Sequence, residues 1–427
     1  MSGFYNEVVI IEAIRKHPNA DSLSFATVMS NYDVIIKTGE FEVGQTAAYI
    51  GLDAVCPDTE QFYFMCPVHR SEDGQILGKK FAVGSVPERY RVIKAKKIRN
   101  IFSAGLLVPT PTIDKVAVFM NGVPFEANED AGFGKHIWNS SKEYSQFLVA
   151  NPELLVSRKD ERMEIRFVSF PMKVGESVVD YFGLKKVLEE EEENVISSGK
   201  IKEQNTHKPE GWSIPYYDKE SLRKYISCLL PDEEIVLTEK CHGSNAGFCY
   251  DGNELWCKSR NNYKRGIITW TDADGIEQKV ESSDQWWTCA RQYGLEEKLK
   301  QHPGLVFFSE CAGQIKGFPY DSKIISSKRQ LCLYFFDVYD TKTMRYFDYD
   351  DRVALIKSLG LTPVPEIYRG KFLEKDKMFA FAEGKTLTGG GHIREGFVLN
   401  TVKERYEPKL NGRMSVKFVG EGYSLAK

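Results

Sequence analysis

The 427-residue chain has no apolar run of the roughly 18 residues that a membrane-spanning helix needs, so we expect no membrane span. Its first residues, Met1 to Glu7, lack the basic and apolar regions of a secretory signal peptide. The nine cysteines are odd in number and include no Cys-x-x-Cys pair, which is typical of a reduced intracellular protein rather than of a disulfide framework. Together these absences predict a cytoplasmic protein that contacts no membrane.

A strong excess of one charge is also missing: 57 lysines and arginines stand against 60 aspartates and glutamates, a formal net charge of −3. This balance excludes a protein that coats nucleic acid by bulk attraction, but it permits local basic surfaces. Residues 89–100 form such a basic segment, and two interpretations stay open: a strand whose charges face water, or a strand that tracks nucleic-acid phosphates. The candidate phosphate contacts are Arg91, Lys94, Lys96, Lys97 and Arg99.

Clusters of metal-ligating residues are scarce. Cys66 and His69 have a spacing that zinc tolerates, and Cys56 lies nearby in the sequence. A structural zinc site needs four ligands, however, and no fourth candidate is close. We therefore expect free thiols in this segment.

Short apolar and β-branched runs, separated by turn residues, fill the first hundred residues. The expected strands cover residues 8–11, 25–28, 33–36 and 47–50. Several short strands at this spacing predict a small all-β barrel.

Residues 110–166 carry no recognisable motif. The segment that follows, residues 171–177, repeats the turn chemistry of residues 42–46, which indicates that the chain returns to the same module after an insertion. A helix over 177–187 is expected to close this first module, which spans residues 1–187.

The acidic run and polar residues of 188–210 predict a solvated linker. Beyond it, residues 211–427 mix strands and helices, as expected of an α+β domain. The expected strands are residues 234–240, 246–250, 254–259, 305–311, 331–339 and 396–401. The expected helices are residues 219–229, 284–293 and 350–359.

Lys240 lies in the run Thr238 to Asn245, directly after the hydrophobic residues of the first of these strands. We expect it at the end of a buried strand, where burial lowers the pKa of an amine and makes it nucleophilic. Lowering the usual lysine pKa of about 10.4 by about 3 units is worth about 4 kcal/mol in availability of the neutral amine. Gly243 permits a tight turn at which the backbone can approach a ligand closely. Glu239, the preceding strand residue, should face away from the site.

Basic, acidic and aromatic side chains at or beside later strands follow in order along the chain. They are Arg260 after the strand 254–259, Glu310 in the strand 305–311, Phe336 in the strand 331–339, Glu395 before the strand 396–401, and Lys417. Each alone has an ordinary structural explanation, since single carboxylates are mostly solvated and single strand aromatics are mostly core. Because they fall in one order at plausible spacing, we favour a single site.

The spacing Lys-x-His-Gly-x-Asn, followed by these segments, resembles the motifs of ATP-dependent RNA ligases, in the bacteriophage RNA ligase 2-like branch of covalent nucleotidyltransferases. Residues 211–427 carry this resemblance most fully. Residues 17–23 and 94–109 resemble the OB-fold module that precedes the catalytic domain in some RNA ligases. The resemblance implies an α+β fold: a nucleotidyltransferase (ATP-grasp-like ligase) domain of antiparallel sheets and helices, preceded by an all-β OB-fold barrel that binds nucleic acid.

The resemblance also implies residue roles. Lys240 matches the lysine that becomes adenylated, Glu310 the carboxylate that holds the ribose, and Phe336 the ring stacked on adenine. Glu395 matches a carboxylate associated with metal binding and Lys417 a lysine near the α-phosphate. The implied catalytic residues are Lys240, His242, Arg260, Glu310, Glu395 and Lys417; the implied nucleotide contacts are Glu239, Gly243, Asn245, Phe336 and Arg413; the implied metal ligands are Glu310 and Glu395.

One position departs from the phage-type pattern, which has two lysines separated by one residue near the end of the domain. Ser415 stands at the first of these positions. Either Arg413 supplies the missing charge, or Lys417 acts alone.

The implied reaction begins with attack of Lys240 on the α-phosphorus of ATP, which releases pyrophosphate and leaves AMP on the lysine. The AMP then passes to an RNA 5′-phosphate, and a 3′-hydroxyl displaces it, which the resemblance places at nicks in duplexes and in RNA repair. Mg²⁺ or Mn²⁺ suits the paired carboxylates, and together with Lys417 should lower the lysine pKa further. Lys264 and Arg265 are the expected strand contacts beside the site.

Two other classes stay open. DNA ligases and capping guanylyltransferases share the lysine chemistry, but they usually have Asp where this chain has His242 and add an OB domain after the last motif, whereas ten residues follow Lys417 here. A nucleic-acid-binding protein with a decayed transferase site is favoured by Ser415 and disfavoured by the retained lysine and carboxylates.

Overall fold

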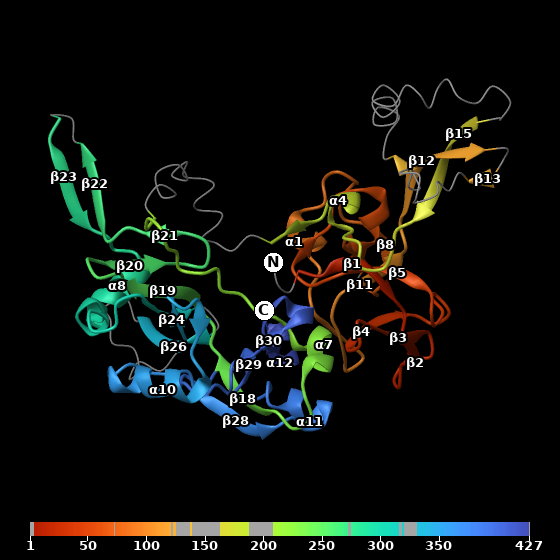
Figure 1. Ribbon diagram of the computed structural model, residues 1–427. Helices are drawn as coiled ribbons and strands as arrows, with labels where there is room; N and C mark the ends of the chain where they lie inside the picture. The colour runs from red at the N-terminus through yellow and green to blue at the C-terminus, as the bar shows by residue number, and fades with distance from the viewer. Residues whose placement is uncertain are drawn as a thin grey trace.

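The computed structural model describes residues 4–71, 73–120, 123–124, 137–138, 163–187, 208–271, 275–315, 318–319 and 331–426. Figure 1 shows a β-rich N-terminal region beside a larger α+β region. Within the described part of the chain, no helix is long and apolar enough to cross a membrane.

The N-terminal region is built from short antiparallel strands. They are β1 (Asn6–Ile10), β2 (Ala13–Lys16), β3 (Leu23–Val28), β4 (Tyr32–Lys37), β5 (Thr46–Ile50), β6 (Ala54–Val55), β9 (Lys96–Ile98), β10 (Ile101–Ser103) and β11 (Leu106–Pro109). β1, β5 and β11 form one sheet, and β2, β3 and β4 form another. Aliphatic residues of both sheets, such as Val9, Val34 and Leu107, are buried in one cluster. The all-β character and the four expected strands are confirmed.

Between β6 and β9 lie η1 (Glu60–Met65), β7 (Val68–Arg70), β8 (Ile76–Lys79) and α1 (Glu88–Arg91). The expectation of one basic strand over 89–100 is therefore wrong. Pro87 precedes α1, and its fixed φ suits a helix start. Arg99 and Asn100 then turn the chain in the left-handed region, with φ of 46° and 70°, between β9 and β10. The basic side chains consequently lie on a helical turn and a hairpin, not on one strand face.

A long pair of strands extends from this region. β12 (Thr112–Met120) pairs antiparallel with β15 (Met163–Pro171), and β13 (Val123–Pro124) and β14 (Ile137–Trp138) join the same sheet. After β15 the chain returns to β1, where Val178 N donates to Asn6 O at 2.9 Å.

The helix expected over 177–187 is shorter than expected. α4 (Val179–Phe182) ends at Gly183, whose φ of 67° is the left-handed conformation that terminates helices, and β16 (Lys185–Lys186) follows. Residues 188–207 of the expected linker lie outside the described residues.

The α+β region contains two main sheets. The first has the order β17–β32–β29–β18–β28 and consists of β17 (Glu220–Ser221), β18 (Glu234–Lys240), β28 (Glu366–Lys371), β29 (Gly396–Thr401) and β32 (Ser415–Val419). The second has the order β21–β20–β19–β24–β26–β27, with β25 paired to β24. Its strands are β19 (Ser244–Tyr250), β20 (Leu255–Lys258), β21 (Tyr263–Lys264), β24 (Leu305–Ile315), β25 (Phe318–Pro319), β26 (Leu331–Asp340) and β27 (Arg345–Tyr346).

Two hairpins complete the strands: β22 (Ile267–Thr271) with β23 (Glu277–Glu281), and β30 (Tyr406–Glu407) with β31 (Gly412–Arg413). The helices are α7 (Leu222–Tyr225), η3 (Ile226–Cys228), α8 (Gln285–Gln292), α9 (Leu295–Leu299), α10 (Tyr349–Ser358), α11 (Lys375–Ala380), η4 (Pro408–Leu410) and α12 (Glu421–Ala426). The helices expected at 284–293 and 350–359 are confirmed as α8 and α10. The helix expected over 219–229 is interrupted, because its start pairs with β32 as the strand β17.

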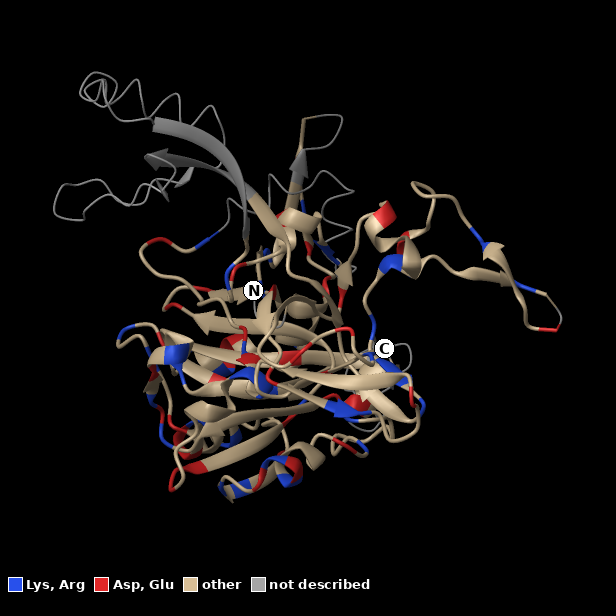
Figure 2. Ribbon diagram, turned by 90° about the vertical axis from the view of Figure 1, so that its right-hand side faces the viewer, with Lys and Arg blue, Asp and Glu red and all other residues tan. Residues whose placement is uncertain are grey.

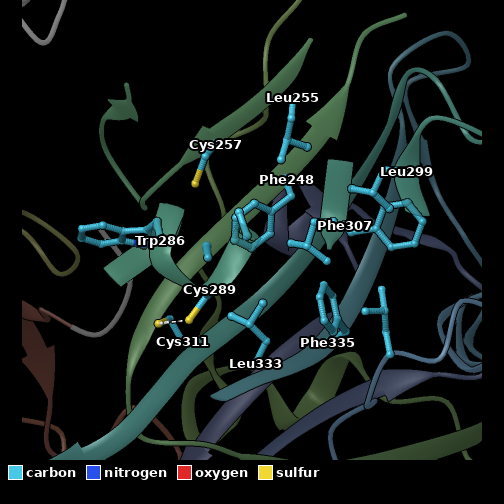
Figure 3. Close-up of a cluster of buried hydrophobic side chains, with 14 of the residues drawn as sticks. Phe248, Leu255, Cys257, Trp286, Cys289, Leu299, Phe307, Cys311, Leu333 and Phe335 are labelled. Carbon is cyan, nitrogen blue, oxygen red and sulfur yellow. Dashed lines mark hydrogen bonds between the residues drawn. The ribbon is translucent and has the colours of Figure 1, made fainter. Parts of the chain in front are cut away.

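The second sheet has its core on the face covered by α8 and α9 (Figure 3). Alternation along the strands brings Phe248, Phe307 and Phe335 to this face, each fully buried. Burying one such side chain contributes about 1.5–3 kcal/mol. Cys289 and Cys311 lie in the same core, where their thiols form a hydrogen bond, with the sulfurs 3.4 Å apart, and no disulfide. All nine cysteines are free and buried, as the sequence predicts.

The two regions meet at β17 and α7. The hydroxyl of Tyr5 donates to Glu220 Oε2 at 2.5 Å, and that of Tyr32 to Ser221 Oγ at 2.8 Å. Lys224 Nζ lies 2.6 Å from Glu7 Oε1. We refer to these contacts as the joint between the regions.

Candidate active site

Lys240 is the last residue of β18, as the sequence predicts. The register of β18 with β29 sets Lys240 opposite Gly396, which brings the preceding residue, Glu395, beside the lysine. Lys240 Nζ donates to Glu395 Oε1 at 2.5 Å, and the two side chains are 26% and 11% exposed. The lysine side chain is therefore largely, but not fully, buried.

Glu310 reaches the same place from the second sheet. β19 follows β18 after a tight turn and pairs with β24, with Asn245 opposite Glu310. Gly243 in this turn packs so closely on β24 that a Cβ would clash with the carbonyl oxygen of Cys311. The backbone at Gly243 thus makes its close approach to β24 and not to a ligand. This contact brings the ends of the two sheets together.

The pKa of Lys240 is raised, so the expectation of a lowered pKa is wrong for the protein alone. Burial lowers the pKa, and Arg260 acts in the same direction. The negative charges of Glu395 and Glu310 outweigh both. The lysine is therefore held as an ammonium ion between two carboxylates.

Lys417 lies on β32, opposite Val398 of β29. Its Nζ donates to Asp218 Oδ1 at 3.1 Å. Burial lowers the pKa of Lys417; Asp218 opposes this, whereas the positive charges of Lys240 and Arg260 add to it. The three cations are thus close enough to influence one another. No local motif marks Asp218, because its contact with Lys417 depends on the pairing of β17 with β32.

The contacts of Ser415 and Arg413 distinguish between Arg413 supplying the missing charge and Lys417 acting alone. Ser415 is buried and donates to Asn400 Oδ1 at 2.6 Å. Arg413 is ion-paired with both Asp337 and Glu404. Its charge is therefore balanced inside the protein, which favours Lys417 acting alone.

His242 is held by a residue that the sequence did not reveal. Its Nδ1 lies 2.6 Å from the hydroxyl of Tyr423 in α12 and 3.9 Å from Glu395 Oε2. Burial, and then the charge of Glu395, raise the pKa of Tyr423, so its phenol stays protonated. A tyrosine near the end of the chain carries no local motif that could have linked it to His242.

Phe336 is partly exposed, whereas its neighbour Phe335 is core. The ring centroid of Phe336 lies 4.9 Å from that of Tyr217, and the Phe308 ring is nearly parallel to it at 6.5 Å. Lys219 Nζ lies 4.2 Å from the centroid of Tyr217. Burial lowers the pKa of Lys219 well below its usual value. Phe336 and Tyr217 are thus the partly exposed rings of an aromatic cluster beside Asp218, the partner of Lys417, and Phe308 is the buried ring beneath them.

Glu239, like Arg413, is a predicted site residue whose side chain the structure does not bring to the cluster. It faces away from Lys240, as expected of the preceding strand residue. Its carboxylate is buried and accepts from Leu387 N at 2.7 Å and from the hydroxyl of Thr386.

Beyond β20, the residues that are predicted to contact the nucleic-acid strands lie beside two tryptophans. Lys264 Nζ is 3.9 Å from the ring centroid of Trp286, whose Nε1 donates to Asn245 O at 3.0 Å. Arg265 follows directly, between β21 and β22. Through Trp286, Lys264 and the Arg265 that follows it are therefore linked to β19, one of the strands that build the site.

The predicted nucleic-acid contacts of the N-terminal region divide into two groups. Arg91 donates to the carbonyls of Val86 and Cys56, and Arg99 Nη1 to Asn19 O at 3.0 Å, so both hold backbone. The side chains of Lys94, Lys96 and Lys97 are exposed. Figure 2 shows basic and acidic residues interspersed along the molecule, in keeping with the net charge of −3.

No group of three or more His, Cys, Asp or Glu side chains suited to a metal ion occurs among the described residues. Glu310 and Glu395 form a pair whose charges both act on Lys240. Such a pair suits Mg²⁺ or Mn²⁺, which use one or two carboxylates and complete their coordination with waters and substrate phosphates.

One amine, two carboxylates, two further cations and a histidine thus converge where the two main sheets meet, the first antiparallel except for the parallel pair β17–β32 and the second antiparallel. An amine held among cations that can bind phosphate, next to an aromatic surface, defines the class of nucleotidyl-transferring ligases.

Comparisons with known proteins make the class specific. Residues 233–419 match the RNA ligase family, and residues 6–110 match an OB-fold domain family. The matches place an RNA ligase family domain at residues 233–419 and an OB-fold domain at residues 6–110. No curated protein sequence matches the chain.

Solved structures share the fold. A variant of Naegleria gruberi RNA ligase with ATP and Mn is 18% identical with a TM-score of 0.61, covering 99% of this chain and 98% of that one. The same ligase with PPi is 16% identical with a TM-score of 0.60, over 99% and 98% of the two chains. Another variant, with AMP and Mn, has the same identity, TM-score and coverage as the PPi structure. At these identities the likeness shows the fold.

Proposed function

We propose that the chain is an ATP-dependent RNA ligase that joins 3′-hydroxyl and 5′-phosphate ends through lysyl-AMP and RNA-adenylate intermediates, at nicks in RNA-containing duplexes. The observation that carries the proposal is the convergence of Lys240 with Glu395, Glu310 and Lys417 inside an RNA ligase domain. ATP, AMP and Mn in the related ligase structures support the choice of nucleotide and metal. We assign residues 1–187 to the OB-fold module, 188–210 to the linker and 211–427 to the catalytic domain.

In the first step, Lys240 Nζ attacks the α-phosphorus of ATP, an N–P bond forms and the P–O bond to pyrophosphate breaks. The amine must lose a proton first, and both carboxylates oppose that loss. A divalent cation held by Glu310 and Glu395 would neutralise these two charges and those of the phosphates. The raised pKa of Lys240 thus supports an enzyme whose nucleophile depends on a metal ion.

Lys417 and Arg260 are the cations placed to bind the α-phosphate, and Asp218 orients Lys417. Phosphoryl-group transfer depends mainly on such positioning and charge neutralisation. Phe336, together with Tyr217, offers the aromatic surface on which adenine stacks. Glu310 can also accept a hydrogen bond from the ribose.

In the later steps an RNA 5′-phosphate takes the AMP, and a 3′-hydroxyl displaces it. Lys264 and Arg265 contact the strands beside the site. The exposed lysines of the OB-fold module, Lys94, Lys96 and Lys97, bind phosphates further along the duplex.

The test is covalent labelling with ATP that carries a labelled α-phosphate. Wild-type protein and the matched surface variant Lys377→Ala should gain label in the presence of Mg²⁺ or Mn²⁺, and Lys240→Ala should not. An unlabelled wild-type protein would contradict the proposal and favour a binding protein with a decayed site.

The substrate is tested separately, on nicked duplexes with RNA or DNA on each side of the nick. Sealing should require an RNA strand. Equal sealing of all-DNA nicks would refute the RNA preference without affecting the adenylation step.

A further inference from the structure

Tyr423 contacts the predicted catalytic residue His242 through a single polar atom. Its hydroxyl lies 2.6 Å from His242 Nδ1, and the two ring centroids are 5.7 Å apart with an interplanar angle of 56°. The contact is thus a hydrogen bond between ring edges rather than a stack. Glu395 Oε2, at 3.9 Å, is too far from Nδ1 to compete for it.

Tyr423 is held in place by the same strands that build the site. Gly420, directly after β32, donates its N–H to Glu395 O at 2.9 Å. The first turn of α12 is fixed by Glu383, which accepts from Glu421 N at 2.7 Å and from Gly422 N at 3.2 Å. The side chain of Tyr423 is 4% exposed. The phenol therefore has a fixed position relative to β29, β32 and the lysines they hold.

We propose that Tyr423 is a positioning residue for the adenylation step: its phenol donates to His242 Nδ1 and so fixes the orientation of the imidazole and leaves its proton on Nε2. The inference rests on the proposed function and specifies how His242 serves it. A neutral imidazole has one donor and one acceptor nitrogen, and a phenol that donates to one of them decides which is which. An imidazole held in one orientation, two residues from the nucleophile, adds to the preorganisation of the site.

The first experiment uses Tyr423→Phe, which removes only the hydroxyl, in single-turnover labelling with saturating ATP and Mg²⁺. The rate of adenylation should fall by about ten- to a hundredfold, the range seen when an orienting partner of a catalytic ligand is removed. The ATP concentration for half-maximal rate should stay unchanged, because the phenol does not touch the substrate. Ser424→Ala is the matched control on the same helix, since its hydroxyl bonds only to Gly420 O at 2.8 Å among the described contacts, and it should label at the wild-type rate.

A fall of less than threefold in Tyr423→Phe, with an unchanged unfolding midpoint, would overturn the inference. So would an equal fall in Ser424→Ala, because the effect would then belong to the helix and not to the phenol.

The second experiment measures which nitrogen of the His242 imidazole carries the proton. Nitrogen-15 NMR of protein labelled at histidine should show an unprotonated Nδ1 and a protonated Nε2 at His242, assigned by its loss in His242→Gln. Tyr423→Phe should shift this tautomer balance; a protonated Nδ1 in the wild-type protein would overturn the proposal. Since the spectrum needs no activity, failure of the adenylation chemistry, visible as an unlabelled wild-type protein, stays distinguishable from failure of this inference.

Discussion

Two clusters of opposite charges lie within the α+β region, and they have different surroundings. The site cluster consists of Lys240, Glu395, Glu310, Lys417, Asp218 and Arg260. The buried cluster consists of Asp337, Arg352, Arg413 and Glu404.

The difference lies in the cations, which are more accessible in the site cluster; the carboxylates overlap in exposure, with Glu395 at 11% and Asp218 at 15% against Asp337 at 1% and Glu404 at 16%. Arg352 and Asp337 are 2% and 1% exposed and lie 2.9 Å apart, and Arg413 adds a second cation to the same carboxylate. In the site cluster, Lys240 keeps 26% of its side chain accessible and Lys417 keeps 21%. An enclosed and fully paired cation such as Arg352 holds strands together, whereas a more accessible cation such as Lys240 can exchange its partner for a substrate. The comparison therefore assigns stability to one cluster and chemistry to the other.

The largest effect is expected for Lys240→Arg, which keeps the cation beside Glu395 but removes the nucleophile. Adenylate formation should fall at least about a thousandfold, since no other group can form the bond. Rates of labelling from ATP measure this, and a labelled Lys240→Arg protein would exclude Lys240 as the acceptor.

Arg352→Met should mainly affect stability. Removing one partner of a buried ion pair costs about 3–5 kcal/mol. Urea unfolding should show this loss, while the folded protein labels within about threefold of the wild-type rate because Arg352 lies outside the site. A stable but inactive variant would reverse the assignment of the two clusters.

Lys417→Gln and Arg413→Gln test the comparison at two neighbouring positions. Losing the phosphate-binding cation should slow adenylation by about a hundredfold, or about 2.7 kcal/mol. Arg413→Gln should lower the free energy of unfolding by about 1–3 kcal/mol and change the rate little. Equal losses of adenylation rate in both variants would mean that Arg413 also binds the phosphate.

The buried cluster should also make stability depend on acid pH. Burial raises the pKa of Asp337, but Arg352 and then Arg413 outweigh it and lower the pKa to about 2. A carboxyl with a lowered folded-state pKa stabilises the protein above its unfolded pKa of about 3.9, and this stabilisation is lost as the pH falls through that value toward about 2. Urea midpoints between pH 5 and pH 3 should therefore fall more steeply for the wild-type protein than for Asp337→Asn. Parallel slopes would contradict the lowered pKa.

The smallest effect is expected at an exposed ion pair. Lys371 Nζ lies 2.7 Å from Asp232 Oδ1, with side chains 64% and 91% exposed. Because water screens such pairs, Lys371→Ala should change the free energy of unfolding by less than about 1 kcal/mol and leave labelling unchanged. A larger loss of unfolding free energy would show that the exposure of the side chains alone does not predict how much each ion pair stabilises this protein.

Long, strongly patterned segments were predictable from the sequence. The strand 234–240 ends at Lys240 as expected, and the strand 396–401 is β29 with the same bounds. The order of the motifs also predicted that Glu395 and Glu310 would meet Lys240. These predictions succeed because an apolar run of strand length specifies both the element and its end.

What could not be predicted depends on which side chain faces which neighbour. Arg413 and Arg91 carry the right charge, yet the fold pairs one with Asp337 and uses the other to hold carbonyls. Tyr423 and Asp218 belong to the site only through the positions of β32 and β17. The raised pKa of Lys240 likewise follows from distances to two carboxylates, which the sequence does not contain.

The joint between the regions has a consequence for their spacing. Tyr5, Tyr32 and Glu7 bind the catalytic domain at residues 220–224, immediately beside the strand that carries Lys417. These contacts therefore set the reach, meaning the distance from the exposed lysines of the OB-fold domain to the nucleophile. On the proposed function, inserting residues between 188 and 210 would leave that reach unchanged, and the footprint on a duplex would keep the same number of base pairs.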